Sequence, residues 1–177
     1  NVIDMSGMFK KCSSLIDISG ISNFDTKNVK YINSMFDSCE KLKSLPNLNW
    51  NTNNIVDMSC LFKFCSQLNS IKEISKFNTE NVKNMSQMFY NCSSLTSLDL
   101  HGLDLSSVTS GDGATTYCSN LSNGINMTGT KVNTATKHLC KYATIASIPN
   151  IDVSYVTIMQ GMFQDCSSLT SLNLSNW

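Results

Sequence analysis

The chain lacks an excess of charge of either sign. Thirteen basic residues balance thirteen acidic ones among 177 residues, and charged residues make up only 15% of the chain. A protein whose main partner is nucleic acid or an anionic membrane surface carries a basic face, because the phosphates that it binds are negative. The composition therefore predicts no nucleic-acid partner.

The chain also lacks a long apolar run. No stretch approaches the roughly 20 apolar residues with which a helix crosses a bilayer, so we expect no membrane insertion in this segment. The first residues, Asn1-Val2-Ile3-Asp4, do not have the basic and then apolar character of a secretory signal.

Groups that carry catalysis or metal binding are scarce as well. The only histidines are His101 and His138, and the eight cysteines contain no C-x-x-C pair. A zinc site at His138 would need further ligands such as Cys118. The loop at 111–113, Gly-Asp-Gly, lacks the several spaced oxygen ligands of a calcium loop, and no Ser/His/Asp set is placed for catalysis. We therefore expect no catalytic residues, no cofactor, no metal and no enzyme activity.

What the chain does contain is a repeat, clearest at 81–100, where the sequence reads NVKNMSQMFYNCSSLTSLDL. Before Cys92, apolar residues recur at three- and four-residue intervals, which is the spacing of one helix face, and Asn81 stands at the N-cap position. After Cys92 the sequence Leu98-Asp99-Leu100 alternates as a strand does. One unit is therefore predicted to be a short helix, a tight Cys-Ser-Ser turn and a short strand.

The unit recurs at intervals of 27, 26, 27, 26, 22 and 26 residues. A period of this length indicates repeats that fold only by stacking on one another. We predict an α/β solenoid that forms a single domain over 1–177, with a continuous sheet of seven short strands. Because the chain opens and stops inside a unit, we expect it to be a segment of a longer protein. The seven repeats are centred on Cys12, Cys39, Cys65, Cys92, Cys118, Cys140 and Cys166.

The fifth and sixth units, over 108–150, are degenerate. Gly111, Ala114 and Thr115 stand where the intact units have Met, Met and Phe, and the spacing around Cys140 is short. We predict that the stack continues here with a thinner core. The alternative is that 108–150 is an insertion loop.

The seven repeat cysteines fall inside the apolar stripe, which favours a buried ladder of free thiols over a disulfide framework. Cys60 points away from the stripe, so we predict an exposed thiol or an intermolecular disulfide. A second column, with Phe24, Trp50 and Phe77, could be a sugar-binding strip, but its place beside the core favours an internal spine. The Asp or Asn that follows each of these aromatic residues suits a turn, because its side chain bonds nearby backbone.

The pattern N-V-x-x-M-S-x-M-F-x-x-C-S-S-L-T-S-L-D-L, followed by F-[DN]-T-x-N-V, resembles the repeat of BspA-family leucine-rich-repeat surface proteins, in the variant of about 25 residues. The resemblance covers 1–105 and 151–177. It implies a right-handed leucine-rich-repeat superhelix with one short parallel strand and one short helix per repeat. It also implies an extracellular or cell-surface location and a role that is adhesive or that of a stalk.

In leucine-rich-repeat proteins the concave strand face is where partners dock. We therefore predict non-enzymatic binding or adhesion to a protein or glycan through that face. The alternative is a structural spacer or a subunit of an extracellular or surface filament, which self-associates through open ends of the stack. The candidate binding face consists of residues five and seven places after the repeat cysteines: Asp17, Ser44, Ser70, Lys72, Ser97, Asp99, Ser171 and Asn173.

Overall fold

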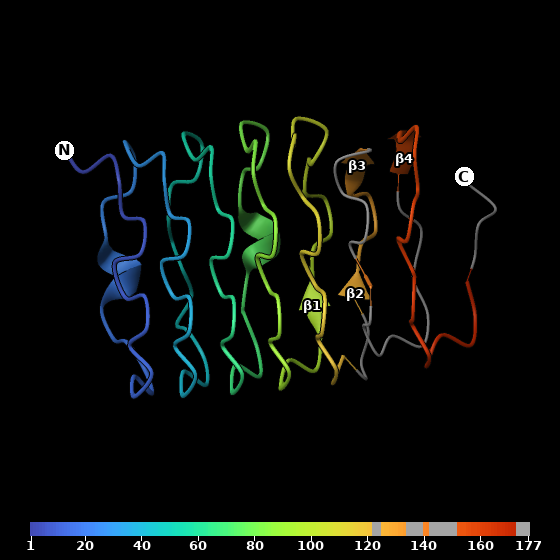
Figure 1. The fold of residues 1–177 in the computed structure, drawn as a ribbon. Helices are drawn as coiled ribbons and strands as arrows, with labels where there is room; N and C mark the ends of the chain where they lie inside the picture. The colour runs from blue at the N-terminus through green and yellow to red at the C-terminus, as the bar shows by residue number, and fades with distance from the viewer. Residues whose placement is uncertain (122–124, 134–139, 142–151, 173–177) are drawn as a thin grey trace.

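Successive repeats lie side by side in sequence order. The structure is a computed structural model that describes residues 1–121, 125–133, 140–141 and 152–172. The described repeats each form one elongated coil of chain, and Figure 1 shows these coils as a row in sequence order. We number the coils in the order of the repeat cysteines.

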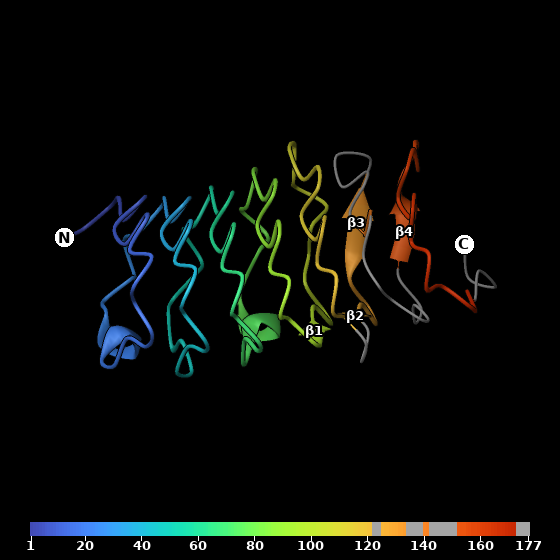
Figure 2. The same cartoon turned by 60° about the horizontal axis from the view of Figure 1, so that its bottom comes forward.

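Regular secondary structure is sparse. Two 3₁₀-helices, η1 (Ile21–Asn23) and η2 (Ile74–Lys76), occur in the described ranges. The strands β1 (Leu98–Asp99) and β2 (Ile125–Asn126) form one parallel pair, and β3 (Lys131–Asn133) and β4 (Asp152–Tyr155) form another. The two pairs lie toward opposite ends of the coils (Figures 1 and 2). Elsewhere, single parallel bridges join coil to coil, and one such series runs through Asp4, Tyr31, Asp57, Asn84 and Ser110.

The predicted α/β solenoid, with a helix and a strand in each repeat, is wrong. The described residues contain no α-helix, and strand pairing is confined to two two-stranded sheets and isolated bridges. The coils consist mostly of turns. Asn81 does not cap a helix; its side-chain amide donates to the carbonyl of Asn53 in the preceding coil at 2.8 Å. No helix in the described ranges has the length and apolar character for crossing a membrane.

The physical reason lies in where the backbone N–H groups bond. In an α-helix each N–H bonds to the carbonyl four residues earlier. Here successive N–H groups alternate between two kinds of acceptor. One N–H donates to the carbonyl three residues earlier in the same coil, and the next N–H donates to a carbonyl of the following coil. In the second coil the inter-coil donors are Ile32, Ser34, Phe36 and Ser38, and their acceptors are the carbonyls of Asp57, Ser59, Leu61 and Lys63.

Two left-handed residues before the repeat cysteine produce this alternation in the first five coils and in the seventh. Their φ values lie between 55° and 70°, in a region that bends the chain out of the right-handed helical course. Such consecutive turns bring every third or fourth residue to the inside, which is the same spacing that a helix face has. The first left-handed column holds Gly7, Ser34, Cys60, Gln87, Gly113 and Gly161, and the second holds Lys11, Ser38, Phe64, Asn91, Tyr117 and Asp165.

Phenylalanine forms a continuous stack through the core. The rings of Phe9, Phe36, Phe62 and Phe89 follow one another with centroids 5.5, 5.5 and 5.6 Å apart. The last three are fully buried. Stacked rings at this distance combine apolar burial with a favourable ring-to-ring geometry.

The second aromatic column is an internal spine, as predicted. Trp50 and Phe77 are buried and stack at 6.4 Å, and the Trp50 indole N–H donates to the carbonyl of Ile21 at 2.9 Å. Phe24 is half-buried. The sugar-strip interpretation of this column is therefore wrong, because the rings are covered.

The cysteine ladder is confirmed for the middle of the chain. All eight cysteines are free thiols, and the repeat cysteines of the second to sixth coils are buried. The thiols also donate to phenylalanine carbonyls in the preceding coil, for example Cys65 to Phe36 at 3.1 Å and Cys92 to Phe62 at 3.0 Å. Each such carbonyl therefore uses both lone pairs, since it also accepts the N–H of its own turn.

Three thiols depart from the prediction. Cys12, placed in the buried ladder, is exposed, because no described coil covers the outer side of the first coil. Cys166 is only half-buried. Cys60, predicted to be exposed, is half-buried with its sulfur 3.9 Å from Gln87 Oε1.

The degenerate fifth unit follows the course of the intact ones. Ala114 and Thr115 are buried at the places of Met and Phe. The N–H groups of Met85 and Phe89 bond to the carbonyls of Ser110 and Ala114, at 2.8 and 2.7 Å. Most of the sixth unit, including 134–139 and 142–150, lies outside the described residues.

Candidate functional site

The predicted binding residues do line up across neighbouring coils. The N–H of Lys43 donates to the carbonyl of Ile16 at 3.2 Å, that of Asn69 to Lys43 at 3.1 Å, and that of Thr96 to Asn69 at 3.4 Å. These bonds place Asp17, Ser44, Ser70 and Ser97 in successive positions of one line, which we call the polar row. We include the other predicted binding residues of the described ranges, Lys72, Asp99 and Ser171, in the polar row.

Most members of the polar row face solvent. Ser70 is half-buried, and Asn173 lies outside the described residues. The row has small hydroxyl side chains and, among its described residues, three charged groups. It therefore offers hydrogen-bonding groups but no strong electrostatic potential of either sign. The exposed members are Asp17, Ser44, Lys72, Ser97, Asp99 and Ser171.

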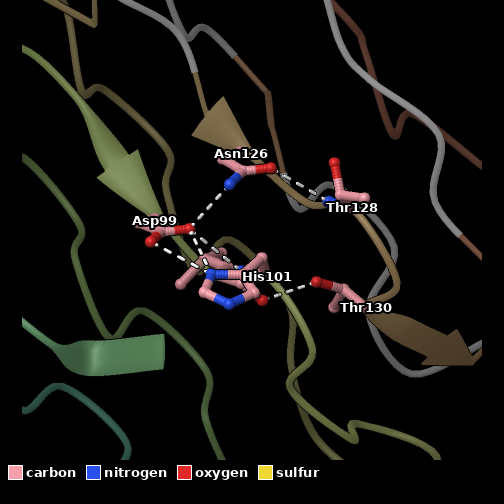
Figure 3. A network of polar contacts seen from close by, with 6 residues as sticks. Asp99, His101, Asn126, Thr128 and Thr130 are labelled. Atoms are coloured by element: carbon pink, nitrogen blue, oxygen red, sulfur yellow. Dashed lines mark hydrogen bonds and ion pairs between the residues drawn. The ribbon is translucent and has the colours of Figure 1, made fainter. Parts of the chain in front are cut away.

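A polar network surrounds Asp99 at β1 (Figure 3). Both carboxylate oxygens lie near Nδ1 of His101, at 3.0 and 3.1 Å, and the His101 backbone N–H donates to Oδ1. From the next coil, Asn126 donates its side-chain amide to the same oxygen at 2.9 Å. The Asn126 side-chain oxygen in turn accepts the Thr128 N–H at 3.2 Å. The parallel register of Asp99 and Asn126 brings these groups together.

The electrostatics of Asp99 follow from this network. Partial burial raises the pKa of the carboxyl, but hydrogen bonds from His101 and Asn126 stabilise the carboxylate more, so the pKa is lower than that of an ordinary aspartate. Asp99 is therefore ionised at neutral pH and held in one position. It offers a fixed negative charge at the end of the row.

The cysteines do not supply reactive groups to this surface. Burial raises the pKa of the Cys39 thiol to about 11 and that of Cys118 to about 12. Burial also raises the pKa of Cys60. A thiol with a raised pKa stays protonated at neutral pH and is a poor nucleophile and metal ligand.

The described residues hold no group of three or more His, Cys, Asp or Glu side chains that could bind a metal ion. His138, weighed as a zinc ligand with Cys118, lies outside the described residues. The segment at 111–113 forms part of the fifth coil's turns, and the Asp112 carbonyl accepts the Gln87 N–H at 3.1 Å.

Sequence reasoning missed an exposed aromatic cluster and the hollow beside it. Phe64, Tyr90 and Tyr117 come from three consecutive coils, with ring centroids 5.5 and 5.3 Å apart. The signal in the sequence is that each stands one or two places before its repeat cysteine. The hollow, which we call the aromatic groove, has a volume of about 610 Å³ and is lined by Ser86, Gln87, Tyr90, Asp112, Gly113, Thr116, Tyr117 and Lys141.

Comparison with known proteins gives a match to a protein family. The family described as "Mycoplasma protein of unknown function, DUF285" matches residues 3–128 and 144–177. No curated protein and no solved structure matches the chain significantly. Since the two matched segments cover most of its length, the chain belongs to the DUF285 family of Mycoplasma proteins of unknown function.

Proposed function

We propose that this chain is a non-enzymatic binding module of a surface protein, which holds a protein or glycan partner along the polar row. The observation that carries the proposal is the alignment of the row by three inter-coil backbone hydrogen bonds. The resemblance of the repeat to BspA-family surface proteins supports an extracellular or cell-surface location and an adhesive role.

The chemistry of the row suits a broad surface of modest affinity. Its exposed serines give and accept hydrogen bonds, while Asp17, Lys72 and Asp99 supply isolated charges. Repeated hydrogen-bonding groups on a rigid backbone lower the entropic cost of ordering a surface upon binding. Contacts spread over several coils then add up to useful affinity.

Lys72 is the cleanest position for a test. Its side chain is exposed and has no hydrogen bond or ion pair within the described part of the chain. Asp99 is less suitable, because its replacement also breaks the contacts with His101 and Asn126. A charge reversal at Lys72 therefore changes the surface without changing the fold.

The experiment measures binding of the purified chain to immobilised extracellular-matrix glycoproteins and to immobilised oligosaccharides. We expect Lys72→Glu to weaken binding of the recognised probe about tenfold and to leave thermal stability unchanged. Lys83→Glu, an exposed lysine outside the row, is the matched control and should bind as the parent does. Equal binding by the parent and the Lys72→Glu variant would rule out the polar row as the binding face.

We also propose a second candidate, a structural role in an assembly. Four apolar side chains of the first coil, those of Val2, Ile3, Met8 and Ile16, are each exposed by about half. Exposed apolar side chains favour contact with another protein surface. Light scattering distinguishes this role: an apparent mass that grows with concentration supports it, whereas a constant monomer mass contradicts it.

A further inference from the structure

The aromatic groove has features that the polar row lacks. Tyr90 stands nearly perpendicular to both of its neighbours, at 79° to Phe64 and 81° to Tyr117. Phe64 and Tyr117 are exposed by 37% and 44%, respectively. Tyr90, between them, is half-buried. Clustered aromatic rings with exposed members mark binding surfaces.

Lys63 organises one end of this cluster. Its ammonium nitrogen lies 5.2 Å from the ring centroid of Phe64 and 5.4 Å from that of Tyr90, within the range of cation–π attraction. The same nitrogen donates to Gln87 Oε1 at 2.7 Å. Lys63 therefore lies at the Phe64 end of the cluster and holds the Gln87 amide, whereas the Tyr117 ring at the other end is 44% exposed.

The walls of the groove are held by backbone hydrogen bonds between the fourth and fifth coils. The N–H of Gln87 donates to the carbonyl of Asp112 at 3.1 Å, and that of Asn91 donates to Thr116 at 2.9 Å. Gly113 forms part of the lining, and a Cβ at this position would lie 3.1 Å from the Thr116 hydroxyl oxygen. The groove is thus present before any ligand binds, which lowers the entropic cost of binding.

The lining combines aromatic rings with varied polar groups. Besides Tyr90 and Tyr117, the lining contains the amide of Gln87, the carboxylate of Asp112 and the ammonium group of Lys141. Ser86 and Thr116 add hydroxyl groups. Asp112 and Lys141 give the lining itself no excess charge, and the ammonium group of Lys63 is bonded to Gln87 at its edge. An amphipathic peptide helix would require a predominantly apolar groove.

We propose that the aromatic groove binds a neutral oligosaccharide. A sugar ring has an apolar C–H face, which packs on a tyrosine ring, and a rim of hydroxyls, which hydrogen-bond to the carboxylate and amide side chains. The groove has both kinds of group within one hollow. This inference goes beyond the proposed function, because the groove and the polar row consist of different residues. Apart from Lys141, which follows Cys140, the groove residues stand one to six places before the repeat cysteines, whereas the polar row stands five and seven places after them.

The test uses defined neutral oligosaccharides of glucose, mannose, galactose and N-acetylglucosamine, first as an immobilised panel and then by calorimetric titration of the best binder. We expect Tyr117→Ala to weaken binding of that sugar about tenfold, because one stacking ring is lost. Tyr117→Phe keeps the ring and should stay within about threefold of the parent.

Two control variants distinguish the groove from the rest of the surface. Tyr31→Ala removes a tyrosine of similar exposure outside the groove and should leave sugar affinity unchanged. Lys72→Glu should leave the affinity for a sugar bound in the groove unchanged. A sugar whose binding is weakened by Lys72→Glu but not by Tyr117→Ala would be bound by the polar row and not by the groove, so either proposal can fail without the other. Circular dichroism and thermal unfolding verify that each variant is folded.

Three results would overturn the inference. One is that no sugar of the panel binds the parent at millimolar concentration. Another is that the folded Tyr117→Ala variant binds sugar as the parent does. The third is that Tyr117→Ala abolishes binding to an immobilised protein while no sugar binds, since the groove would then be a protein interface.

Discussion

The left-handed positions decide the path of the backbone residue by residue. A left-handed conformation costs a residue with a side chain roughly 1–2 kcal/mol relative to the right-handed one. The first left-handed column is glycine in the first, fifth and seventh coils, but Ser34, Cys60 and Gln87 occupy it in between. At these positions the inter-coil hydrogen bonds that the bend makes possible offset the strain.

Replacing Ser34 by glycine should therefore stabilise the protein. Ser34 has φ 55°, is half-buried, and its hydroxyl makes no hydrogen bond within the described ranges. Glycine relieves the left-handed strain but adds freedom to the unfolded chain, so we expect a net gain of about 0.5–1 kcal/mol in the free energy of unfolding. Urea denaturation provides the measurement.

Ser34→Ala is the matched control, because alanine retains the strain. We expect its stability to stay within about 0.5 kcal/mol of the parent. A glycine variant no more stable than the alanine variant would show that this position is not strained.

At the scale of the element, the turns are fixed by aspartate and asparagine side chains. Asp25, Asn51, Asn78 and Asp104 each accept the N–H of the residue two places further on, at 3.0–3.3 Å. The Asp/Asn-turn prediction is thus confirmed, and it could be made from sequence because the interaction spans only two residues. Asp104 has an additional partner in the next coil, Lys131, whose Nζ lies 2.8 Å from Oδ2.

The Asp104 contacts predict a loss of stability in acid. Partial burial raises the pKa of this carboxyl, but hydrogen bonds from Lys131 and Ser106 lower it more, so the folded-state pKa lies below the usual value. The carboxylate therefore adds stability above the unfolded pKa of about 3.9, and that contribution disappears as the pH falls toward the lower folded value. Urea unfolding between about pH 5 and pH 3 should show the decline.

Asp104→Asn keeps a side-chain oxygen for Ser106 and removes the charge. We expect it to lose about 0.5–1 kcal/mol at pH 7 and to depend less on pH in the acid range than the parent does. Identical acid sensitivity in the two proteins would assign the decline to other carboxylates.

At the scale of the whole molecule, the coils stabilise one another through stacked columns. A phenylalanine in the middle of its column has a ring on each side, whereas Phe9 stacks on one ring of the described residues, that of Phe36, and is half-buried. The same substitution should therefore have a different effect at the two places.

Phe62→Ala should cost about 3–5 kcal/mol in the free energy of unfolding, because it removes a fully buried ring and leaves a cavity between Phe36 and Phe89. Phe9→Ala should cost roughly half as much, since part of its surface is already exposed. Chemical denaturation of the two variants in parallel tests this. Equal losses would contradict a core in which each coil depends on both neighbours.

Sequence reasoning also identified which residues gather inside. It located the phenylalanine and cysteine columns, because a side chain that recurs once per repeat in an apolar stripe has to be buried somewhere. It identified the polar row in the same way. It did not find the aromatic groove, because Phe64, Tyr90 and Tyr117 are not at one fixed offset from their cysteines and meet only when three coils lie side by side.

The sequence by itself determined the repeat boundaries, the buried columns and the short-range turns, since these depend on periodicity and on contacts two or three residues long. Only the tertiary structure decided that the segment before the cysteine, in each repeat where this segment is described, is a run of turns and not a helix. Both arrangements bury every third or fourth residue, so their patterns look alike. The choice between them depends on whether an N–H group bonds within its own segment or to a carbonyl about 26 residues away, and that acceptor exists only after the neighbouring coil has packed.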